Sequence, residues 1–312
     1  MAQTTGQGEF QTILEPVADT GFMVTPYVKE LVDYSLIYLK ADLPIHFSGS
    51  AGTGKTALAL YVAAQLKRPI VLIHGDEECK TSDLIGAEYG FRLKRMRDQY
   101  IHSVTKTEEN LVKSWVDNRL TVACKYGFTL IYDEFTRSRP EANNALLSVL
   151  EEKMLDMPAI GGDENYLQVH PDFRAIFTSN PAEYAGVFTA QDALRNRLVT
   201  INLGHFDQAT EITIVKSRAG LVEQDSRKIV QLVRAFREKG KGIYKYEPTI
   251  RESIKIAKAL KVQSLHPSRK EPFFRTICLH ILTSEVHPEK MKNQKNQSKL
   301  IQLLNELIDQ EM

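Results

Sequence analysis

A glycine-rich octapeptide, GSAGTGKT, occupies Gly49–Thr56 and fits the pattern G-x-x-x-x-G-K-[ST]. Glycines in such a loop let backbone N–H groups approach phosphate oxygens, and a helix that follows presents its positive N-terminus to the same anion. In loops of this pattern the lysine, here Lys55, reaches the β- and γ-phosphates, and the hydroxyl of Thr56 ligates Mg²⁺. We therefore predict that MgATP is bound by Gly49, Ser50, Ala51, Gly52, Thr53, Gly54, Lys55 and Thr56.

Two adjacent carboxylates, Asp133 and Glu134, follow the apolar segment Phe128–Tyr132. Carboxylates at the carboxyl end of a buried strand lie where ligands bind in open α/β sheets. Asp133 would hold Mg²⁺, and Glu134 would orient and polarise the water that attacks the γ-phosphate. Taken alone, the pair could simply begin a surface loop. Together with the loop at Gly49–Thr56, it predicts an enzyme that hydrolyses ATP.

Three further polar residues could complete a catalytic site with Lys55 and Glu134. Asn180 follows the apolar segment Ala175–Phe177, from which it could reach the γ-phosphate or the attacking water, although Asn180-Pro181 could also be only the start of a turn. Arg197 precedes an apolar segment, and Arg251 lies at the start of a predicted helix. Guanidinium groups stabilise the charge on a transferring phosphoryl group, in cis or in trans. Either arginine could instead be a solvated surface residue.

Short apolar segments alternate with helical segments in the first two thirds of the chain, which predicts a doubly wound α/β domain with a five-stranded parallel sheet. We expect a helix over Thr56–Leu66, directly after the glycine-rich loop, and a loose tail over residues 1–20. The five predicted strands are Pro44–Ser48, Ile70–Ile73, Phe128–Tyr132, Ala175–Phe177 and Leu198–Leu203.

The last third of the chain has the periodicity of helices alone. Leu300, Leu303, Leu304, Leu307 and Ile308, for example, form a single apolar stripe. We therefore predict a tail at 1–20, an α/β domain at 21–204 and a small all-helical domain at 205–312. The predicted helices of the latter are Gln208–Arg218, Ser226–Lys239, Pro248–Lys261, Phe273–Ser284 and Ser298–Gln310.

Composition excludes several classes of partner. A net charge of +1 gives no general affinity for nucleic acid or an anionic membrane, and no apolar run approaches the ~20 residues of a membrane helix. The first ten residues lack the basic and apolar regions of a signal peptide. Cys79, Cys124 and Cys278 lie far apart and form no CxxC pair. We expect a cytoplasmic protein without a structural metal.

The order of these motifs resembles that of the AAA+ ATPases of the MoxR branch. In that family the phosphate-binding loop (Walker A) is followed by an Asp-Glu pair (Walker B), a sensor asparagine, an arginine before the last strand, and a helical lid with its own arginine. The branch also has an insertion, which we expect to be helical over about 78–105, and a hairpin, which we expect over about 154–169. The resemblance implies an arginine finger at Arg197, acting on ATP bound by the neighbouring subunit, and a second sensor at Arg251. Arg195 stays open as an alternative finger, and Arg137 would also face the neighbour.

Within that branch the segments KTSDLIG (80–86) and DEFTRSRPE (133–141) resemble those of the gas vesicle ATPase family. This resemblance covers roughly Phe22 to Leu260. It implies a homo-hexameric, ATP-driven remodelling factor, or chaperone, that is required for gas vesicle assembly and growth and that could associate with the vesicle. The implied client is the gas vesicle shell protein or accessory gas vesicle proteins, and the basic residues Arg92, Lys94, Arg95 and Arg97 could contact an acidic client or remain a solvated face.

Three other functions are open on the sequence alone. One is a MoxR-type activase, which remodels rubisco or nitric oxide reductase together with a von Willebrand-type partner. Another is a small-molecule kinase, although a water-polarising glutamate such as Glu134 is unexpected in an enzyme that must exclude water. The third is a passive scaffold locked by ATP, which the presence of both Glu134 and Asn180 disfavours.

Overall fold

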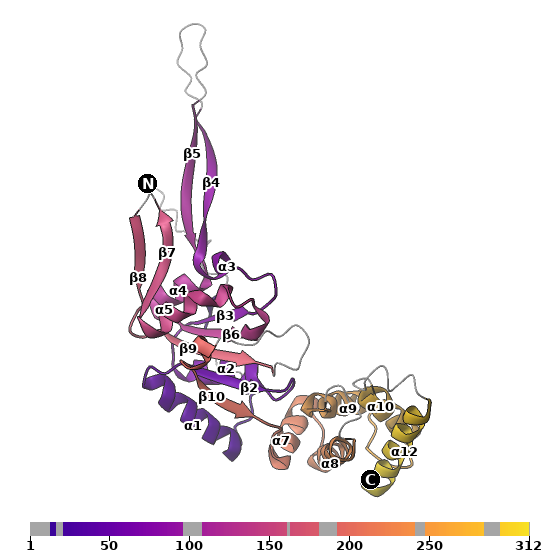
Figure 1. Cartoon of the computed structure of the whole chain (residues 1–312). Helices are drawn as coiled ribbons and strands as arrows, with labels where there is room; N and C mark the ends of the chain where they lie inside the picture. Colours follow the sequence, from indigo (N-terminus) through magenta and orange to yellow (C-terminus); the bar gives the residue numbers. More distant parts are fainter. Residues whose placement is uncertain are drawn as a thin grey trace, which may run out of the picture. The chain divides into compact units, whose positions relative to one another are not determined.

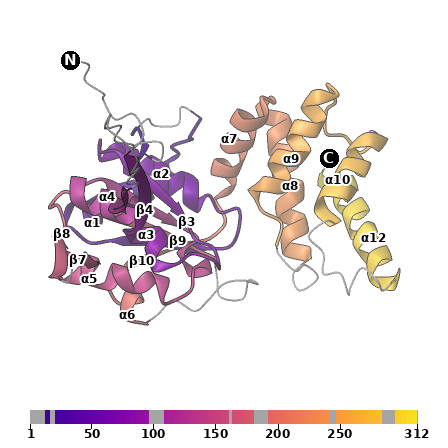
Figure 2. The same ribbon diagram turned by 90° about the horizontal axis from the view of Figure 1, so that it is seen from above.

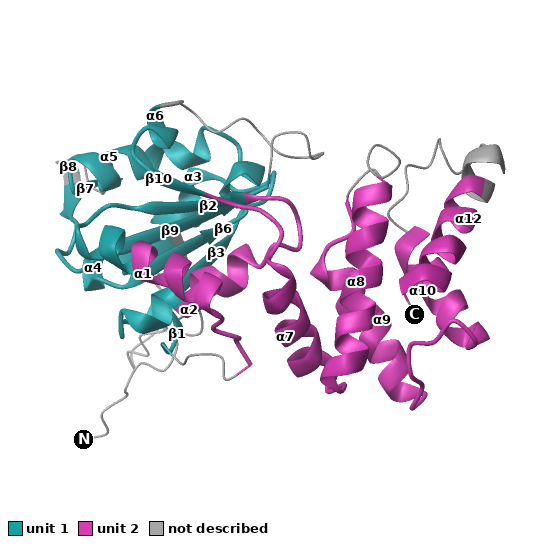
Figure 3. Ribbon diagram, turned by 90° about the horizontal axis from the view of Figure 1, so that it is seen from below, with its two compact units in different colours: residues 1–17, 36–48, 62–201 teal, residues 18–35, 49–61, 202–312 magenta. Residues whose placement is uncertain are grey.

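The computed structural model describes residues 13–16, 21–95, 108–160, 163–180, 192–240, 247–283 and 294–311. The chain forms two compact units, coloured separately in Figure 3. The first unit comprises residues 1–17, 36–48 and 62–201, and the second comprises residues 18–35, 49–61 and 202–312. The second unit thus combines the glycine-rich loop with the C-terminal helices, so the compact units do not coincide with the predicted boundary at residue 204.

A six-stranded sheet forms the centre of the α/β region, with the strand order β1-β3-β6-β9-β2-β10. Strands β3, β6, β9 and β2 are mutually parallel (Figure 1). The first strand, at Ile13–Leu14, pairs with β3 in the antiparallel direction. The five predicted strands are confirmed as β2 (Ile45–Gly49), β3 (Ile70–His74), β6 (Thr129–Asp133), β9 (Arg174–Ser179) and β10 (Val199–Leu203).

The sixth strand, β1 (Ile13–Leu14), corrects the expectation of a sheet of five strands. Of the loose tail expected over residues 1–20, residues 1–12 and 17–20 lie outside the described residues. Strand β1 has only two residues, which is too short for an alternating pattern to appear in the sequence. Its pairing with Val71 and Ile70 is decided by the free edge of β3.

The sheet is buried on both faces, as its strand sequences predict. All five residues of β6 are buried, and Tyr132 and Phe177 on neighbouring strands are fully buried. Apolar strands of this kind require helices on both faces of a parallel sheet. The helices of this region are α1 (Pro26–Lys40), α2 (Lys55–Gln65), α3 (Thr81–Ile85), α4 (Arg119–Tyr126), α5 (Ala145–Glu151) and α6 (Asp192–Arg195), with short 3₁₀ turns at Phe135–Arg137 and Ala142–Asn144.

Two antiparallel hairpins extend from the first unit. In the described residues of the insertion, which we expected to be helical, the short helix α3 is followed by the hairpin of β4 (Gly86–Arg95) and β5 (Glu108–Asp117) (Figure 1). Glycines and aromatic residues in 86–95 disfavour a helix and suit a strand, which accounts for the difference. Arg92, Lys94 and Arg95 belong to β4, and Arg97 lies outside the described residues. The second hairpin, β7 (Met154–Ile160) and β8 (Asp163–Gln168), falls within the segment for which a hairpin was expected.

The C-terminal part of the second unit is entirely helical in the residues described. The five predicted helices are confirmed as α7 (Gln208–Ala219), α8 (Glu223–Lys239), α9 (Ile250–Val262), α10 (Pro272–Thr283) and α12 (Gln294–Glu311). Helix α8 packs against α7, α9 and α12 around the fully buried Phe236, and α10 contributes Phe274 to the same core (Figure 2). Across the ranges that the structure describes, no helix combines the length and the apolar character that crossing a membrane requires.

Candidate active site

The glycine-rich loop connects β2 to α2, as the sequence pattern requires. Gly52 and Gly54 have φ angles of +83° and +81°, a region that residues with a side chain rarely adopt. Lys55 is 7% exposed, and its Nζ donates to the carbonyl oxygens of Gly49 at 2.9 Å and Ser50 at 2.8 Å. The lysine ammonium is thus held against the loop at the first turn of α2. This combination of left-handed glycines, a helix N-terminus and a lysine fits a triphosphate.

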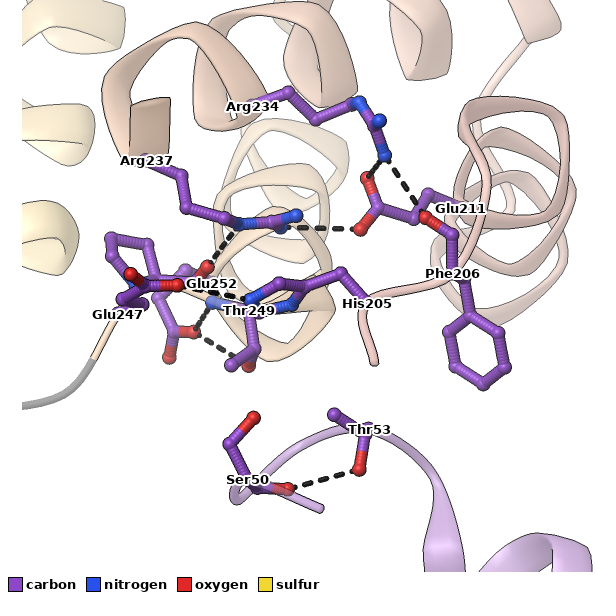
Figure 4. A network of polar contacts seen from close by, with 11 residues as sticks. Ser50, Thr53, His205, Phe206, Glu211, Arg234, Arg237, Glu247, Thr249 and Glu252 are labelled. Carbon is purple, nitrogen blue, oxygen red and sulfur yellow. Dashed lines mark hydrogen bonds and ion pairs between the residues drawn. The ribbon is translucent and has the colours of Figure 1, made fainter. Parts of the chain in front are cut away.

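Two residues from the C-terminal part of the chain lie against this loop. A Cβ atom added to Gly52 would lie 2.3 Å from Thr249 Oγ1, and one added to Gly54 would lie 3.0 Å from Phe206 Cζ. Figure 4 shows Thr249 facing the loop segment that carries Ser50 and Thr53. Glycine is therefore needed at residue 52 for its backbone conformation and also for the close approach of Thr249. Sequence reasoning did not identify either contact.

Thr249 is also the N-cap of α9. The Glu252 carboxylate accepts hydrogen bonds from Thr249 N at 2.8 Å and Thr249 Oγ1 at 2.9 Å, and Arg251 N donates to Thr249 Oγ1 at 3.2 Å. Burial alone would raise the pKa of Glu252, but the hydrogen bonds from Thr249 and Lys255 outweigh it and the pKa is lowered. This cap places Arg251, which is exposed, in the first turn of a helix whose N-cap touches the loop.

A cluster of charged side chains, formed by Glu211, Arg234 and Arg237, contacts the residue before Thr249. Glu211, which is 1% exposed, accepts from Arg234 Nη1 at 3.2 Å and from Arg237 Nη2 at 3.1 Å (Figure 4). Arg237 Nε donates to the carbonyl oxygen of Pro248, the residue before Thr249, at 2.6 Å. The cluster thus ties α7 and α8 to the start of α9. Removing one partner of such a buried group leaves an uncompensated charge, so the cluster fixes the position of Thr249.

The acid pair belongs to the first unit, at the carboxyl end of β6. Asp133 is 7% exposed, and its Oδ1 accepts a hydrogen bond of 2.6 Å from Thr178 Oγ1 on the parallel strand β9. Its Oδ2 lies 3.5 Å from Nδ1 of His74, the last residue of β3. The carboxylate is therefore oriented from both neighbouring strands. Neither Thr178 nor His74 was predicted to act on it, and the only signal in the sequence was their position at the carboxyl ends of apolar segments.

Glu134 adopts a left-handed backbone conformation, with φ at +53°. Its N–H donates to Thr178 Oγ1 at 2.9 Å. Its carboxylate accepts from Asn180 Nδ2 at 3.4 Å and from Arg137 Nη1 at 3.0 Å. The structure thus brings together two residues that we predicted for the site, Glu134 and Asn180. The pairing with Arg137 was not predicted, and because both side chains are more than a third exposed it contributes little to stability.

The two candidate arginine fingers lie just before β10. Arg197 pairs through Nη2 with Glu151 and donates through Nη1 to the carbonyl oxygen of Ala193. Arg195 is exposed on α6. No contact of either arginine with Asp133 or Glu134 occurs within the ranges that the structure describes, so their role in the chemistry remains a prediction.

Mg²⁺ prefers oxygen ligands and often keeps several waters and phosphate oxygens in its coordination shell. Among the described residues, no group of three or more His, Cys, Asp or Glu side chains could hold a metal ion by itself. The oriented carboxylate of Asp133 and the hydroxyl of Thr56 are oxygen donors of the kind that a nucleotide-bound Mg²⁺ uses. Each of these residues, taken within its own unit, is therefore chemically suited to a nucleotide-bound Mg²⁺.

Known proteins share both the domain and much of the sequence. The family "AAA domain (dynein-related subfamily)" matches residues 44–198. "Gas vesicle ATPase GvpN" of Ancylobacter aquaticus is 49% identical over 273 residues, which are 88% of this chain and 76% of the relative. "Protein NorQ" of Paracoccus denitrificans is 24% identical over a segment that covers 63% of this chain and 65% of the relative. The chain also superposes on a solved structure, the Thermotoga maritima RuvB Holliday junction branch migration motor, with a TM-score of 0.51 and 16% sequence identity. The superposition covers 89% of this chain and 77% of the solved one, and at this identity it shows a shared fold alone.

Proposed function

Because the chain belongs to the GvpN family of gas vesicle ATPases, we propose that it is an ATP-driven remodelling factor that supports gas vesicle assembly and growth. The observation that carries this proposal is the 49% identity to Gas vesicle ATPase GvpN over 88% of the chain. The AAA domain makes the protein an ATPase, which removes the small-molecule kinase from consideration. What the protein remodels is the part that needs experiment.

For the chemistry, we propose that the loop Gly49–Thr56 binds the triphosphate and that Thr56 and Asp133 hold Mg²⁺, the latter through water. Support comes from chain continuity, because Ser48 pairs with Ser179 of β9 and leads directly into Gly49. Strands β2, β9 and β6 are parallel, so their carboxyl ends lie at the same end of the sheet. The loop begins at the carboxyl end of β2, and Asp133 is the last residue of β6. When bound, Mg²⁺ neutralises charge that develops on the phosphates.

Glu134 would orient and polarise the attacking water, and Asn180, whose amide contacts the Glu134 carboxylate, would help to aim it. Lys55 would contact the β- and γ-phosphates, and Arg251 would approach them from the start of α9. In this proposal the protein works by repeated hydrolysis of ATP. Glu134 is held in a strained backbone conformation beside Asn180. Because binding of ATP alone does not require this arrangement, it favours an ATPase over a passive scaffold.

The assembly that we propose is a homo-hexameric ring in which Arg197 acts on ATP bound by the neighbouring subunit. Arg137 would face the same neighbour, and Arg195 is the alternative finger. Mixing Arg197→Ala subunits with Lys55→Ala subunits tests this arrangement. Where a Lys55→Ala subunit presents its finger to the loop of an Arg197→Ala subunit, the interface has an intact loop and an intact finger. Activity of the mixture above that of either variant alone supports a finger in trans. A mixture as inactive as its components contradicts it.

The proposed client is the small hydrophobic shell protein of the vesicle, or accessory gas vesicle proteins, met in the cytoplasm at the growing vesicle. A subunit that polymerises through apolar surface needs to be held and delivered without aggregating, and an ATP-cycled ring can give that process direction. The hairpin of β4 and β5, with Arg92, Lys94 and Arg95 on its first strand, is a candidate contact region.

A second candidate function is that of a MoxR-type activase of a metabolic enzyme, rubisco or nitric oxide reductase, which would need a von Willebrand-type partner. It is supported by the distant similarity to Protein NorQ at 24% identity. The 49% identity to Gas vesicle ATPase GvpN favours the vesicle over this alternative.

The deciding experiment is steady-state ATP hydrolysis by the purified protein, with and without the gas vesicle shell protein, and with Glu134→Gln as the inactive control. We expect the shell protein to stimulate turnover. Robust turnover that ignores the shell protein and the accessory gas vesicle proteins, but responds to an activase partner, would replace the vesicle with a metabolic enzyme as the target.

A further inference from the structure

One buried hydroxyl contacts both residues of the acid pair. Thr178 is fully buried in β9, where its Oγ1 lies 2.6 Å from Asp133 Oδ1 and 2.9 Å from Glu134 N. A backbone N–H can only donate, so the hydroxyl oxygen accepts from Glu134. The single hydroxyl proton is then available for Asp133 alone. The short distance to the carboxylate is that of a charge-assisted hydrogen bond.

We propose that Thr178 is a positioning residue that holds Asp133 and Glu134 as one unit and couples them to β9, the strand that leads into Asn180. It lies two residues before Asn180, whose amide contacts the Glu134 carboxylate. Strand β9 therefore holds the backbone of Glu134 through Thr178, and Asn180, the residue that follows the strand, contacts its side chain. The inference depends on the ATPase chemistry alone and not on which client the protein serves.

The acid pair needs such support because Glu134 is strained. Its φ of +53° is unfavourable for a residue with a side chain. Gly75 lies so close that a Cβ added to it would be 2.2 Å from the Glu134 carbonyl oxygen, and Arg137 N donates to that oxygen at 2.9 Å. These contacts fix the carbonyl of Glu134, whereas Thr178 fixes its N–H. Without the Thr178 hydroxyl, the N–H and the Asp133 carboxylate would lose a shared partner.

The coupling has a mechanical consequence. If Asn180 contacts the γ-phosphate, any displacement of β9 reaches Asp133 and Glu134 through the same hydroxyl. The group that holds Mg²⁺ and the group that aims the water would then move together. A hydroxyl with a purely structural role would stabilise the fold without linking nucleotide affinity to Mg²⁺.

The test compares Thr178→Val, which keeps the shape and removes the hydroxyl, with Thr178→Ser, which keeps the hydroxyl. Thr129→Val is the matched control, because Thr129 is fully buried in β6 and its hydroxyl has no hydrogen-bond partner among the described residues. Affinity for a non-hydrolysable ATP analogue is measured by calorimetry in Mg²⁺ and again in EDTA. The ratio of the two affinities isolates the contribution of Mg²⁺.

We expect Thr178→Val to reduce that ratio by about 10–100-fold, the usual effect of removing a group that orients a metal ligand. Thr178→Ser and Thr129→Val should stay close to the wild-type ratio. In an Asp133→Asn background, Thr178→Val should have little further effect on the ratio, because the two residues act through one contact.

The proposal would be overturned if Thr178→Val lost the same affinity in Mg²⁺ as in EDTA. It would also be overturned if Thr129→Val changed the ratio as much as Thr178→Val does. If Thr178→Val does not fold, Thr178→Cys replaces it, since a thiol is a weak donor of similar size. A Thr178→Cys variant with the wild-type ratio would also overturn the proposal. If the wild-type protein itself bound the analogue equally well in Mg²⁺ and in EDTA, the proposed Mg²⁺ site would be contradicted. This outcome distinguishes failure of the proposed Mg²⁺ site from failure of the role proposed for Thr178.

Discussion

The glycine-rich loop and the acid pair are held in place by different means. The loop depends on the backbone conformations of Gly52 and Gly54 and on a lysine that folds onto carbonyl oxygens five and six residues away. The acids depend on Thr178, which is 45 residues from Asp133 along the chain and belongs to another strand. The comparison shows that the conformation of the glycine-rich loop can be encoded almost locally, whereas the position of the acid pair requires the register of the sheet.

The largest effect is expected at Lys55. Lys55→Ala should lose ATP binding, because removing the charged partner of a desolvated phosphate costs about 2–5 kcal/mol of binding free energy. Calorimetric titration with ATP measures this loss. Lys29→Ala, at an exposed lysine of α1, is the control and should bind normally. Tight ATP binding by Lys55→Ala would contradict the assignment of the loop.

On the acid side, Glu134→Gln should separate binding from turnover. The amide cannot take up a proton, so hydrolysis should fall by about 10²–10⁴-fold while ATP still binds. Parallel measurements of phosphate release and of nucleotide affinity check both halves of this expectation. Unchanged turnover would remove Glu134 from the mechanism.

Gly52→Ala tests how far the loop is really local. We expect a loss of about 1–3 kcal/mol from the left-handed backbone, and an additional loss from the clash with Thr249. Combining it with Thr249→Gly should relieve the clash and make the double variant bind ATP better than the sum of the two single effects predicts. Strictly additive losses of affinity would mean that Thr249 does not constrain the loop.

The smallest effect is expected at Asp207, the N-cap of α7, whose side chain accepts from Thr210 N at 3.0 Å. Burial would raise its pKa, but hydrogen bonds from Thr210 and from backbone N–H groups lower it below 3.8. A lowered pKa stabilises the folded state at pH values above 3.8, and this contribution is lost as the pH falls through the lowered value. Asp207→Ala should cost about 1 kcal/mol at neutral pH.

Urea unfolding of Asp207→Ala at several pH values measures that contribution. Asp207→Asn is the control: it keeps a capping oxygen and should keep most of the neutral-pH stability, but it should lose the part that depends on this carboxylate's titration. Equal stability of the alanine variant and the wild type at neutral pH would exclude a capping role.

Much of the fold was predictable because its signals are short-range. The five predicted strands and the five C-terminal helices follow from apolar segments of a given length and period, which require no knowledge of their partners. The insertion was not predicted correctly, since pairing of 86–95 with 108–117 depends on a second strand across residues 96–107. Glycines and aromatic residues in the first strand were the available hint.

The sequence by itself determined the glycine-rich loop, the acid pair and the strands that carry them, because these depend on consecutive residues and on apolar pattern. Only the tertiary structure decided that Thr178 contacts both acids, that Asn180 reaches Glu134, and that Thr249 lies against Gly52. Such contacts join residues far apart in the chain, and strand register or helix docking fixes them. A threonine in or beside an apolar segment looks the same in a sequence whether its hydroxyl has two partners, as in Thr178, or none among the described residues, as in Thr129.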